Sequence, residues 1–440
     1  MAALEVRARA DAARRRTLTR LAGLGVAVIL LLTVYSGGFF LYAALVLAAM
    51  GGLSWGLSSA GRATATRTID KQRLEEGEVV RVAVTLKNEG GFPTPWLFWE
   101  DRVDGGLTPS GVSCAMLGLG AGGEERFEYT LPARRRGLYR VGPALTEVSG
   151  PFGLVRRVRL GEDATFLTVL PRPVALGAPL TPADRPVREI PRRRSLFEDP
   201  SRFAGIREFR VGDSLRRVHW RATARAGRLQ SRVFEPAVLG GILLAVEMDA
   251  AVWGPAPDGG DGAHPLVELA VTTAASLVDH VLGSGQSVGL FSNGGDAAER
   301  YPADWSGETF RRRSEAVAGV SAKDVRRLRP VSVSVGKGTW QRERLRTALA
   351  RLVPSEGMTL PELLVAELPR MPRSVVLGVV TPRMDEALAA ALGAYRRAGF
   401  EITVIWLKGG GEARVKALPG VAVYPVRDRA SLRRLGAVRL

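Results

Sequence analysis

The chain has 440 residues, of which 46% are apolar, and a formal net charge of +18. This length allows two or three domains, and the apolar content excludes a wholly disordered chain. The positive charge suggests an anionic partner, such as nucleic acid or a membrane surface. Only six of the 62 basic residues are Lys, which indicates a coding bias toward Arg and weakens the nucleic-acid interpretation. The single Cys114 excludes an internal disulfide and favours a reducing compartment.

The N-terminal part has the pattern of a membrane anchor. An Arg-rich segment is followed by 41 residues, 21–61, that contain no charged side chain. About 20 residues cross the hydrocarbon core, so this stretch is too long for one span. We predict a hairpin of two transmembrane helices, Thr17–Tyr35 and Phe39–Leu57, divided by Ser36-Gly37-Gly38. Basic residues flank both sides, which predicts that both ends face the cytoplasm. The second apolar run argues against a cleaved signal peptide.

A two-residue period replaces the apolar runs after residue 62. Val80, Val82, Val84 and Leu86 alternate with more polar residues, and Gly-rich turns separate several such runs. This pattern predicts a small antiparallel module resembling a β-sandwich over residues 62–171. Three aromatic residues on one predicted strand are either a ligand platform or part of the core, and the core interpretation is favoured; they are Trp96, Phe98 and Trp99.

A Pro-rich linker leads into the most basic part of the chain. Between Arg185 and Arg232 there are fourteen Arg residues against five acidic ones. We expect Gly205 and Gly212 to permit backbone conformations that a Cβ would obstruct. Asp213 is expected to accept hydrogen bonds from neighbouring Arg side chains in a two-pronged geometry; the candidates are Arg207, Arg216 and Arg225.

The same stretch contains the pattern G-x-R-E-F-x-x-G-D-x-x-R-x-x-H-W-x-x-x-A-R. It resembles the signature of the bacterial domain-of-unknown-function family 58. The matching positions are Gly205, Arg207, Glu208, Phe209, Gly212, Asp213, Arg216, Trp220, Ala224 and Arg225, with His219 in place of the Asp or Asn of many relatives. The resemblance implies a protein of the bacterial cytoplasmic membrane with a von Willebrand factor type A-like domain. It also implies a MoxR-type AAA+ ATPase as partner, in envelope biogenesis or stress response.

The C-terminal part alternates apolar strands with helices. We predict strands that include 242–248, 287–291, 374–380 and 401–406, separated by helices, which favours a mostly parallel α/β sheet of the Rossmann-like type. The resemblance implies a metal site at the carboxyl ends of these strands, where Mg²⁺ requires hard oxygen ligands. The corresponding positions are Asp249, Ala251, Thr359 and Thr381. They lack the expected serines and third-loop Asp, so we expect a degenerate, metal-free site.

Other chemical motifs are absent from the sequence. The three His residues have no zinc spacing, and no phosphate-binding loop or nucleophile motif occurs. We expect no cofactor and favour a non-enzymatic scaffold, with His219 and Trp220 packing the signature against the α/β domain. One alternative is a hydrolase acting through Glu208, Asp213 and His219. Another is an electrostatic binder of anionic lipid or nucleic acid through residues 185–232, although a nucleic-acid partner is not favoured.

The sequence thus predicts a membrane-anchored, multidomain α+β protein. We divide it into a basic N-terminus (1–16), two transmembrane helices (17–58), a β-sandwich-like domain (62–171), a linker (172–203), the signature (204–236) and a von Willebrand type A-like domain (237–440).

Overall fold

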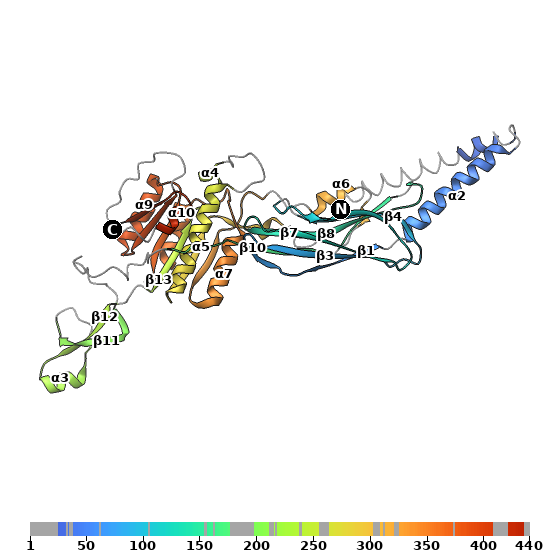
Figure 1. Ribbon diagram of the computed structural model, residues 1–440. Helices are drawn as coiled ribbons and strands as arrows, with labels where there is room; N and C mark the ends of the chain where they lie inside the picture. The colour runs from blue at the N-terminus through green and yellow to red at the C-terminus, as the bar shows by residue number, and fades with distance from the viewer. Residues whose placement is uncertain are drawn as a thin grey trace.

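The computed structural model has a mixed α/β architecture with several sheets. It describes residues 25–31, 34, 38–60, 63–103, 106–153, 156–161, 163–176, 198–210, 215, 218–236, 240–254, 264–301, 309–310, 313–320, 325–372, 375–407 and 421–434. Figure 1 shows four parts: a protruding helix, a β region, an α/β region and a small hairpin. The protruding helix and the hairpin lie at opposite ends of the molecule.

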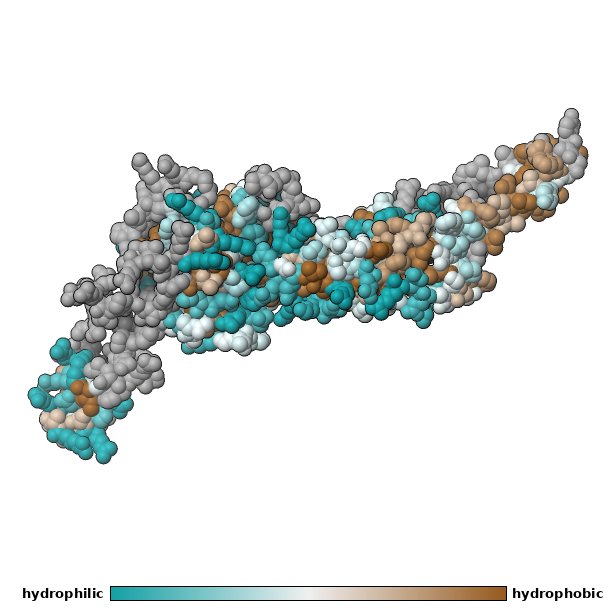
Figure 2. Space-filling view, in the orientation of Figure 1, coloured by the Kyte–Doolittle hydropathy of each residue, from teal (hydrophilic) through white to brown (hydrophobic). Residues whose placement is uncertain are grey.

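The protruding helix, α2 (Phe39–Ala60), has the length and exposure of a membrane span. Its apolar window, Phe39–Gly56, measures about 27 Å at 1.5 Å per residue, and only 6% of it is buried. The space-filling view shows this helix as a mainly apolar surface (Figure 2). Helix α5 (Pro265–Gly283) is also long and apolar, but 72% of it is buried, so it is a core helix.

The predicted helix Thr17–Tyr35 is described only in part. Residues 25–31 and 34 are helical, and most of them are exposed. The segment that precedes them lies outside the described residues. The two-helix hairpin and its orientation in the membrane therefore stay predictions, whereas α2 itself is long and apolar enough to span a membrane.

The β region consists of two sheets that share one core. One sheet has the order β1-β3-β7-β5, and the other joins β9, β8, β10 and β2, with β4 pairing to β8 and β6. The strands are β1 (Ala63–Ile69), β2 (Arg73–Glu75), β3 (Val79–Asn88), β4 (Thr94–Val103), β5 (Ser110–Gly111), β6 (Cys114–Leu119), β7 (Glu124–Pro132), β8 (Gly137–Ser149), β9 (Arg156–Leu160) and β10 (Thr165–Leu170).

Alternation along the strands separates core from surface in this region. Val80, Val82, Val84 and Leu86 of β3 are all buried, as the two-residue period predicts. On β4, Leu97 and Trp99 are fully buried, and the Trp99 ring stacks on Phe127 with 5.2 Å between the ring centroids. Trp96 and Phe98 lie on the opposite face of this strand, since successive side chains alternate. The predicted core placement is therefore correct for Trp99 and wrong for Trp96, which is 47% exposed.

The α/β region is built on a sheet that, within the described residues, has the order β17-β14-β13-β19-β20-β21. All neighbours are parallel except β14 and β17, which run antiparallel. The strands are β13 (Gly241–Val246), β14 (Ser287–Ser292), β17 (Val331–Gly336), β19 (Val376–Thr381), β20 (Ile402–Leu407) and β21 (Ala422–Val426). The chain order reverses between β13 and β19, which is where ligands bind in doubly wound folds.

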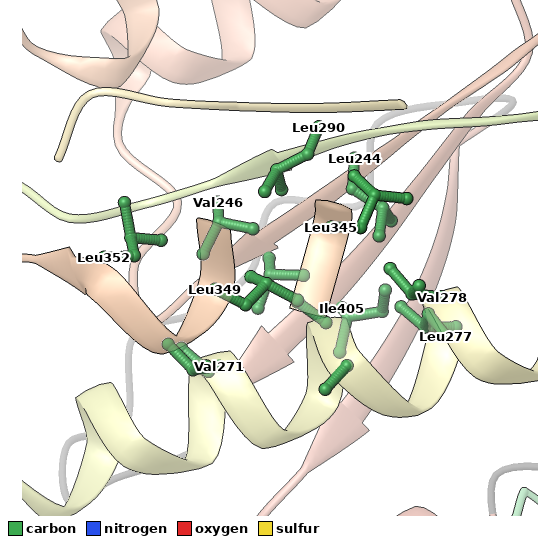
Figure 3. Close-up of a cluster of buried hydrophobic side chains, with 14 of the residues drawn as sticks. Leu244, Val246, Val271, Leu277, Val278, Leu290, Leu345, Leu349, Leu352 and Ile405 are labelled. Carbon is green, nitrogen blue, oxygen red and sulfur yellow. The ribbon is translucent and has the colours of Figure 1, made fainter. Parts of the chain in front are cut away.

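Helices cover both faces of this sheet. Leu244 and Val246 of β13 pack against α5 and α7 (Gly338–Arg351) (Figure 3). Leu432 of α10 (Arg429–Arg434) belongs to the same cluster. Leu243 and Ala245 face α8 (Leu360–Glu367) and α9 (Glu386–Arg397). The remaining elements are α4 (Ala250–Trp253), β15 (Gly295–Asp296), η3 (Ala297–Arg300), β16 (Thr309–Phe310), α6 (Arg313–Val320), β18 (Leu352–Val353) and η4 (Leu368–Arg370). The predicted alternation of strands and helices, covered on both faces, is confirmed.

The β region and the α/β region are joined by polar contacts, those of Arg136 being buried. Arg136 lies between them, and its Nη1 donates to the carbonyl oxygens of Leu349 (3.0 Å) and Leu352 (2.8 Å) at the end of α7. Its Nε lies 3.1 Å from a carboxylate oxygen of Glu268 at the start of α5. Arg346 of α7 donates to Glu75 at 2.7 Å. Because cations stabilise helix C-termini, Arg136 both caps α7 and connects the two regions.

A strap from the α/β region adds to this junction; we define it as β16 and α6. Strand β16 pairs antiparallel with β9 and so extends a sheet of the β region. Ala316 of α6 is fully buried in a small cluster with Leu145, Val158 and Leu160. The two regions therefore share both a sheet and an apolar cluster.

Candidate functional site

The signature forms a hairpin of two strands and one short helix, which we call the signature hairpin. Strand β11 (Glu198–Glu208) pairs antiparallel with β12 (Gln230–Pro236), and α3 (Trp220–Ala226) lies between them in the chain. His219 begins α3, because its Nδ1 accepts a hydrogen bond from the Ala222 amide at 3.1 Å. Gly227 ends α3 in the left-handed conformation, with φ of 66°. Residues next to α3 in the chain therefore fix both ends of this helix.

Few of the described side chains in the signature hairpin are buried. Among its residues whose burial is described, only Val218 (2% exposed) and Ser231 (1%) are buried. Large apolar side chains are instead exposed: Leu215 by 69%, Trp220 by 67% and Ile206 by 43%. In Figure 1 the hairpin lies apart from both larger regions. The expectation that Trp220 packs the signature against the α/β region is therefore wrong, because local backbone contacts hold α3 against β12 while its Trp stays in solvent.

The charged residues of the signature are also on the surface. Arg207, Glu208 and Arg225 are exposed, and Glu208 pairs with Arg228 at 3.4 Å. Phe209 is half-buried, and its amide donates to the Leu229 carbonyl. Gly212, Asp213 and Arg216 lie outside the described residues, so the predicted Arg/Asp contacts stay predictions. Space around Gly205 is open and its φ is not positive, so the steric reason given for this glycine is wrong.

A second candidate lies at the carboxyl ends of β13 and β19. Glu247 directly follows β13 and is only 4% exposed. Its carboxylate accepts hydrogen bonds from Asn293 Nδ2 at 2.8 Å and from the Asp249 amide at 3.1 Å. Burial raises the pKa of Glu247 above its ordinary value, and these hydrogen bonds oppose part of that shift. The result is a buried carboxyl group at the point where the sheet order reverses.

This carboxyl group borders a small cavity of about 90 Å³. Asp249, Thr359, Arg383 and Asp385 also line it. Arg383 Nη2 lies 3.2 Å from a carboxylate oxygen of Asp385. A positively charged guanidinium group of the protein therefore already lines the cavity. The cavity is small enough to hold an ion or a few waters, and it is too small for most organic ligands.

The predicted metal-site positions do not combine into a cation cage. Asp249 and Thr359 line the same cavity, but the Asp249 carboxylate caps α4 by accepting from the Ala251 amide at 2.9 Å. Ala251 has no ligand oxygen, and the Thr381 hydroxyl donates to the Arg383 carbonyl at 2.8 Å. No group of three His, Cys, Asp or Glu suited to a metal occurs among the described residues. The donor set and the adjacent guanidinium group therefore do not suit Mg²⁺.

Comparison with known proteins identifies the signature and part of the α/β region. Residues 205–353 match the family model described as "Protein of unknown function DUF58". This match supports the DUF58 family. It includes α3, β12, β13, α5, β14 and α7, and thus extends well beyond the signature pattern. No curated protein matches the chain.

Three solved structures that resemble this chain each cover about a quarter of it. They include the CARDB domain of the PF1109 protein from Pyrococcus furiosus, at 15% identity and TM-score 0.19, covering 25% of this chain and 89% of that one. Another is the cupredoxin domain of amoB from Nitrosocaldus yellowstonii, at 14% identity and TM-score 0.18, covering 24% and 86%. A third is the PapD-like domain of human CEP192, at 13% identity and TM-score 0.17, covering 24% and 84%. At these scores the similarities carry no functional argument.

Sequence reasoning missed three of the charged residues that line the cavity, two of which, Arg383 and Asp385, lie beyond the matched residues 205–353. Glu247, Arg383 and Asp385 were not among the candidate residues, although Glu247 interrupts an apolar run two residues before Asp249. A charged residue at the end of a buried strand is the signal that identifies it. Asn293, a polar but uncharged residue, likewise directly follows the neighbouring buried strand β14. The site is therefore centred on Glu247 rather than on Asp249.

Proposed function

We propose that this protein is a membrane-anchored, non-enzymatic adaptor whose signature hairpin docks a protein partner. The observation that carries the proposal is the exposure of Trp220 on a hairpin in which, among the residues whose burial is described, only Val218 and Ser231 are buried. The proposed partner is a MoxR-type AAA+ ATPase, which follows from the DUF58 resemblance, in a process such as envelope biogenesis or stress response. Helix α2 is the proposed anchor, with the larger regions in the bacterial cytoplasm.

Physical stability supports a docking role for the hairpin. A two-stranded hairpin is at best marginally stable in water unless another element covers it. Here the described covering is one seven-residue helix, α3, in which no residue is buried. Trp and Arg are the residues that most often dominate binding energy at protein interfaces. Exposed Trp220 and Arg225 on α3 supply both types on one short element.

We further propose that the α/β region is a von Willebrand type A-like domain that has lost metal dependence. Its support is the strand order, in which the third strand in chain order is an antiparallel edge strand and the first is central. Asp249 and Thr359 meet at one cavity, as the resemblance implies. Arg383 supplies a positive charge beside Asp385 in that cavity. In this proposal the guanidinium group occupies the electrostatic role of the cation.

The hydrolase alternative receives no support from the described side chains. His219 uses Nδ1 to cap α3, and Glu208 lies beside Arg228 on the surface. Neither His219 nor Glu208 lines the cavity beside Glu247 or the larger cavity beside Trp96. Catalytic acid/base residues need a concave site that positions substrate and excludes water. The adaptor proposal requires no such site.

A pull-down with matched Trp variants tests the adaptor proposal. The full-length protein is purified from gently solubilised membranes of its own host, beside Trp220→Ala and the control Trp340→Ala. Trp340 is 71% exposed on α7, so the control removes an equally exposed ring elsewhere. We expect the AAA+ ATPase with the parent and the control, and a loss of about 30-fold or more in affinity for Trp220→Ala, as for an interface hot spot. Equal recovery with both variants contradicts docking at the hairpin.

A further inference from the structure

A second exposed apolar site lies at the α2 end of the β region. Strand β1 begins at Ala63, just after α2, and this residue pairs with Asn88 at the end of β3. Trp96 near the start of β4 pairs with Ser149 at the end of β8. The turn after β8 and the turn before β4 therefore lie at the same end of the two sheets as the helix. This end of the β region is the part that approaches the bilayer if α2 is the anchor.

The turn after β8 extends back along α2. Ser54 of α2 is fully buried, and a Cβ placed on Gly150 would lie 2.6 Å from the Ser54 carbonyl oxygen. Only Gly fits this contact between turn and helix. Ser54 precedes Ala60, the last residue of α2, by six residues, which is about 9 Å along the helix axis. It also lies inside the apolar window Phe39–Gly56. The turn thus reaches the level at which the apolar part of α2 ends.

Beside this turn is a cavity of about 340 Å³ with an apolar wall. Trp96, Phe98, Met116 and Phe152 form the apolar part. Three of them are strongly exposed: Met116 by 65%, Trp96 by 47% and Phe152 by 44%. Glu147 and Arg156 form the polar part, with 3.6 Å between the Arg156 Nη1 and a Glu147 oxygen. The site therefore has an amphipathic lining.

We propose that this cavity seats one phospholipid at the cytoplasmic surface of the bilayer. This inference rests on the proposed membrane anchoring by α2. Trp rings favour the membrane interface, where one side is apolar and the other is wet. The aromatic wall contacts the glycerol and upper acyl segment, and Arg156 contacts the phosphate. One guanidinium group can donate two parallel hydrogen bonds to a phosphate group. The depth of the turn along α2 favours lipid, because lipid is the amphiphile present at that level.

Quenching by brominated phospholipid measures contact between each Trp ring and lipid. The full-length protein is reconstituted into vesicles of phosphatidylethanolamine and phosphatidylglycerol, with and without bromine on the upper acyl chain. The variants are Trp96→Phe, Trp55→Phe and the distant control Trp340→Phe. Trp55 is 61% exposed on α2 and reports insertion of the anchor alone. We expect Trp96→Phe and Trp55→Phe each to remove a quenched part of the emission, and Trp340→Phe to remove only an unquenched part.

The variants separate failure of the lipid seat from failure of the anchor. If Trp55→Phe removes quenched emission and Trp96→Phe does not, α2 is inserted in the bilayer but the cavity does not bind lipid. That result overturns the lipid proposal and favours a protein as the occupant. If no variant changes the quenched fraction, both the anchoring by α2 and the seat are overturned. A further variant, Arg156→Glu, is expected to reduce the quenching of Trp96 at least twofold. Undiminished quenching in that variant contradicts the assigned phosphate contact.

Discussion

Arginine has opposite surroundings in two parts of the molecule. One is the junction between the two large regions, and the other is the signature hairpin. At the junction, the Arg136 side chain is 5% exposed and is surrounded by carbonyl oxygens and Glu268. In the hairpin, Arg228 is 68% exposed and meets one carboxylate, Glu208. Buried guanidinium groups need several acceptors, whereas an exposed one remains hydrated. An arginine-rich pattern therefore does not distinguish a structural contact from a docking surface, but burial does.

The contrast extends to how each part is held in place. The junction joins residues more than 200 positions apart, since Arg136 bonds to the carbonyl of Leu352, and the strap adds a strand across the two regions. The hairpin is held by contacts among residues 198–236. The β region and the α/β region are therefore joined by contacts between distant parts of the chain, whereas the proposed docking surface on the signature hairpin rests on local contacts.

The largest expected effect is on the junction. Arg136→Ala leaves Glu268 and the carbonyl groups at the end of α7 without their cation, which we expect to destabilise the protein by about 3–5 kcal/mol. The measurement is chemical unfolding of the detergent-solubilised full chain, followed by Trp fluorescence. The control Arg134→Ala removes an exposed guanidinium two residues away and is expected to change little. Equal stability of both variants contradicts the role of the junction.

A smaller effect is expected at the buried carboxyl group of Glu247. Burial raises its pKa above the ordinary 4.5, so the folded state binds the proton more tightly than the unfolded state. Stability then falls as the pH rises from about 4.5 to the folded-state pKa, and the loss persists at higher pH. Glu247→Gln removes this decline and keeps an oxygen that accepts from Asn293. The control is Glu125→Gln on the exposed face of β7. A parallel pH dependence in parent and Glu247→Gln contradicts the assignment.

The smallest effect is expected in the hairpin. Arg228→Ala removes an exposed ion pair with Glu208, and such pairs contribute about 0–1 kcal/mol. We expect a change in unfolding free energy below about 0.5 kcal/mol, measured as for Arg136→Ala. The comparison between the two arginines fails if Arg228→Ala destabilises the protein as much as Arg136→Ala does.

The sequence predicted elements whose pattern is local and missed features that depend on distant contacts. The sequence predicted the buried alternate residues from Val80 to Leu86, because a two-residue period shows which side of a strand each residue faces. It also predicted the buried strand at 242–248 from a short continuous apolar run. The sequence did not predict the exposure of Trp220, since the sequence of a basic segment does not show whether its aromatic side chain is buried or exposed. The strap was also invisible, because its two-residue strand β16 pairs with a strand 150 positions earlier. Glu247 could have been found from the sequence, because it is a charged residue at the end of an apolar run. The site was assigned to Asp249 instead, because Asp249 resembled the expected metal-binding motif.

Hydrogen exchange of the full-length protein, free and bound to a purified MoxR-type AAA+ ATPase from its host, tests the central claim most directly. The hairpin amides are expected to exchange rapidly in the free protein, because few buried contacts protect them. Binding is expected to slow exchange in α3 and in the adjoining parts of β11 and β12, and to leave the junction around Arg136 unchanged. Protection confined to the α/β region, with no change in residues 205–236, would contradict the adaptor account.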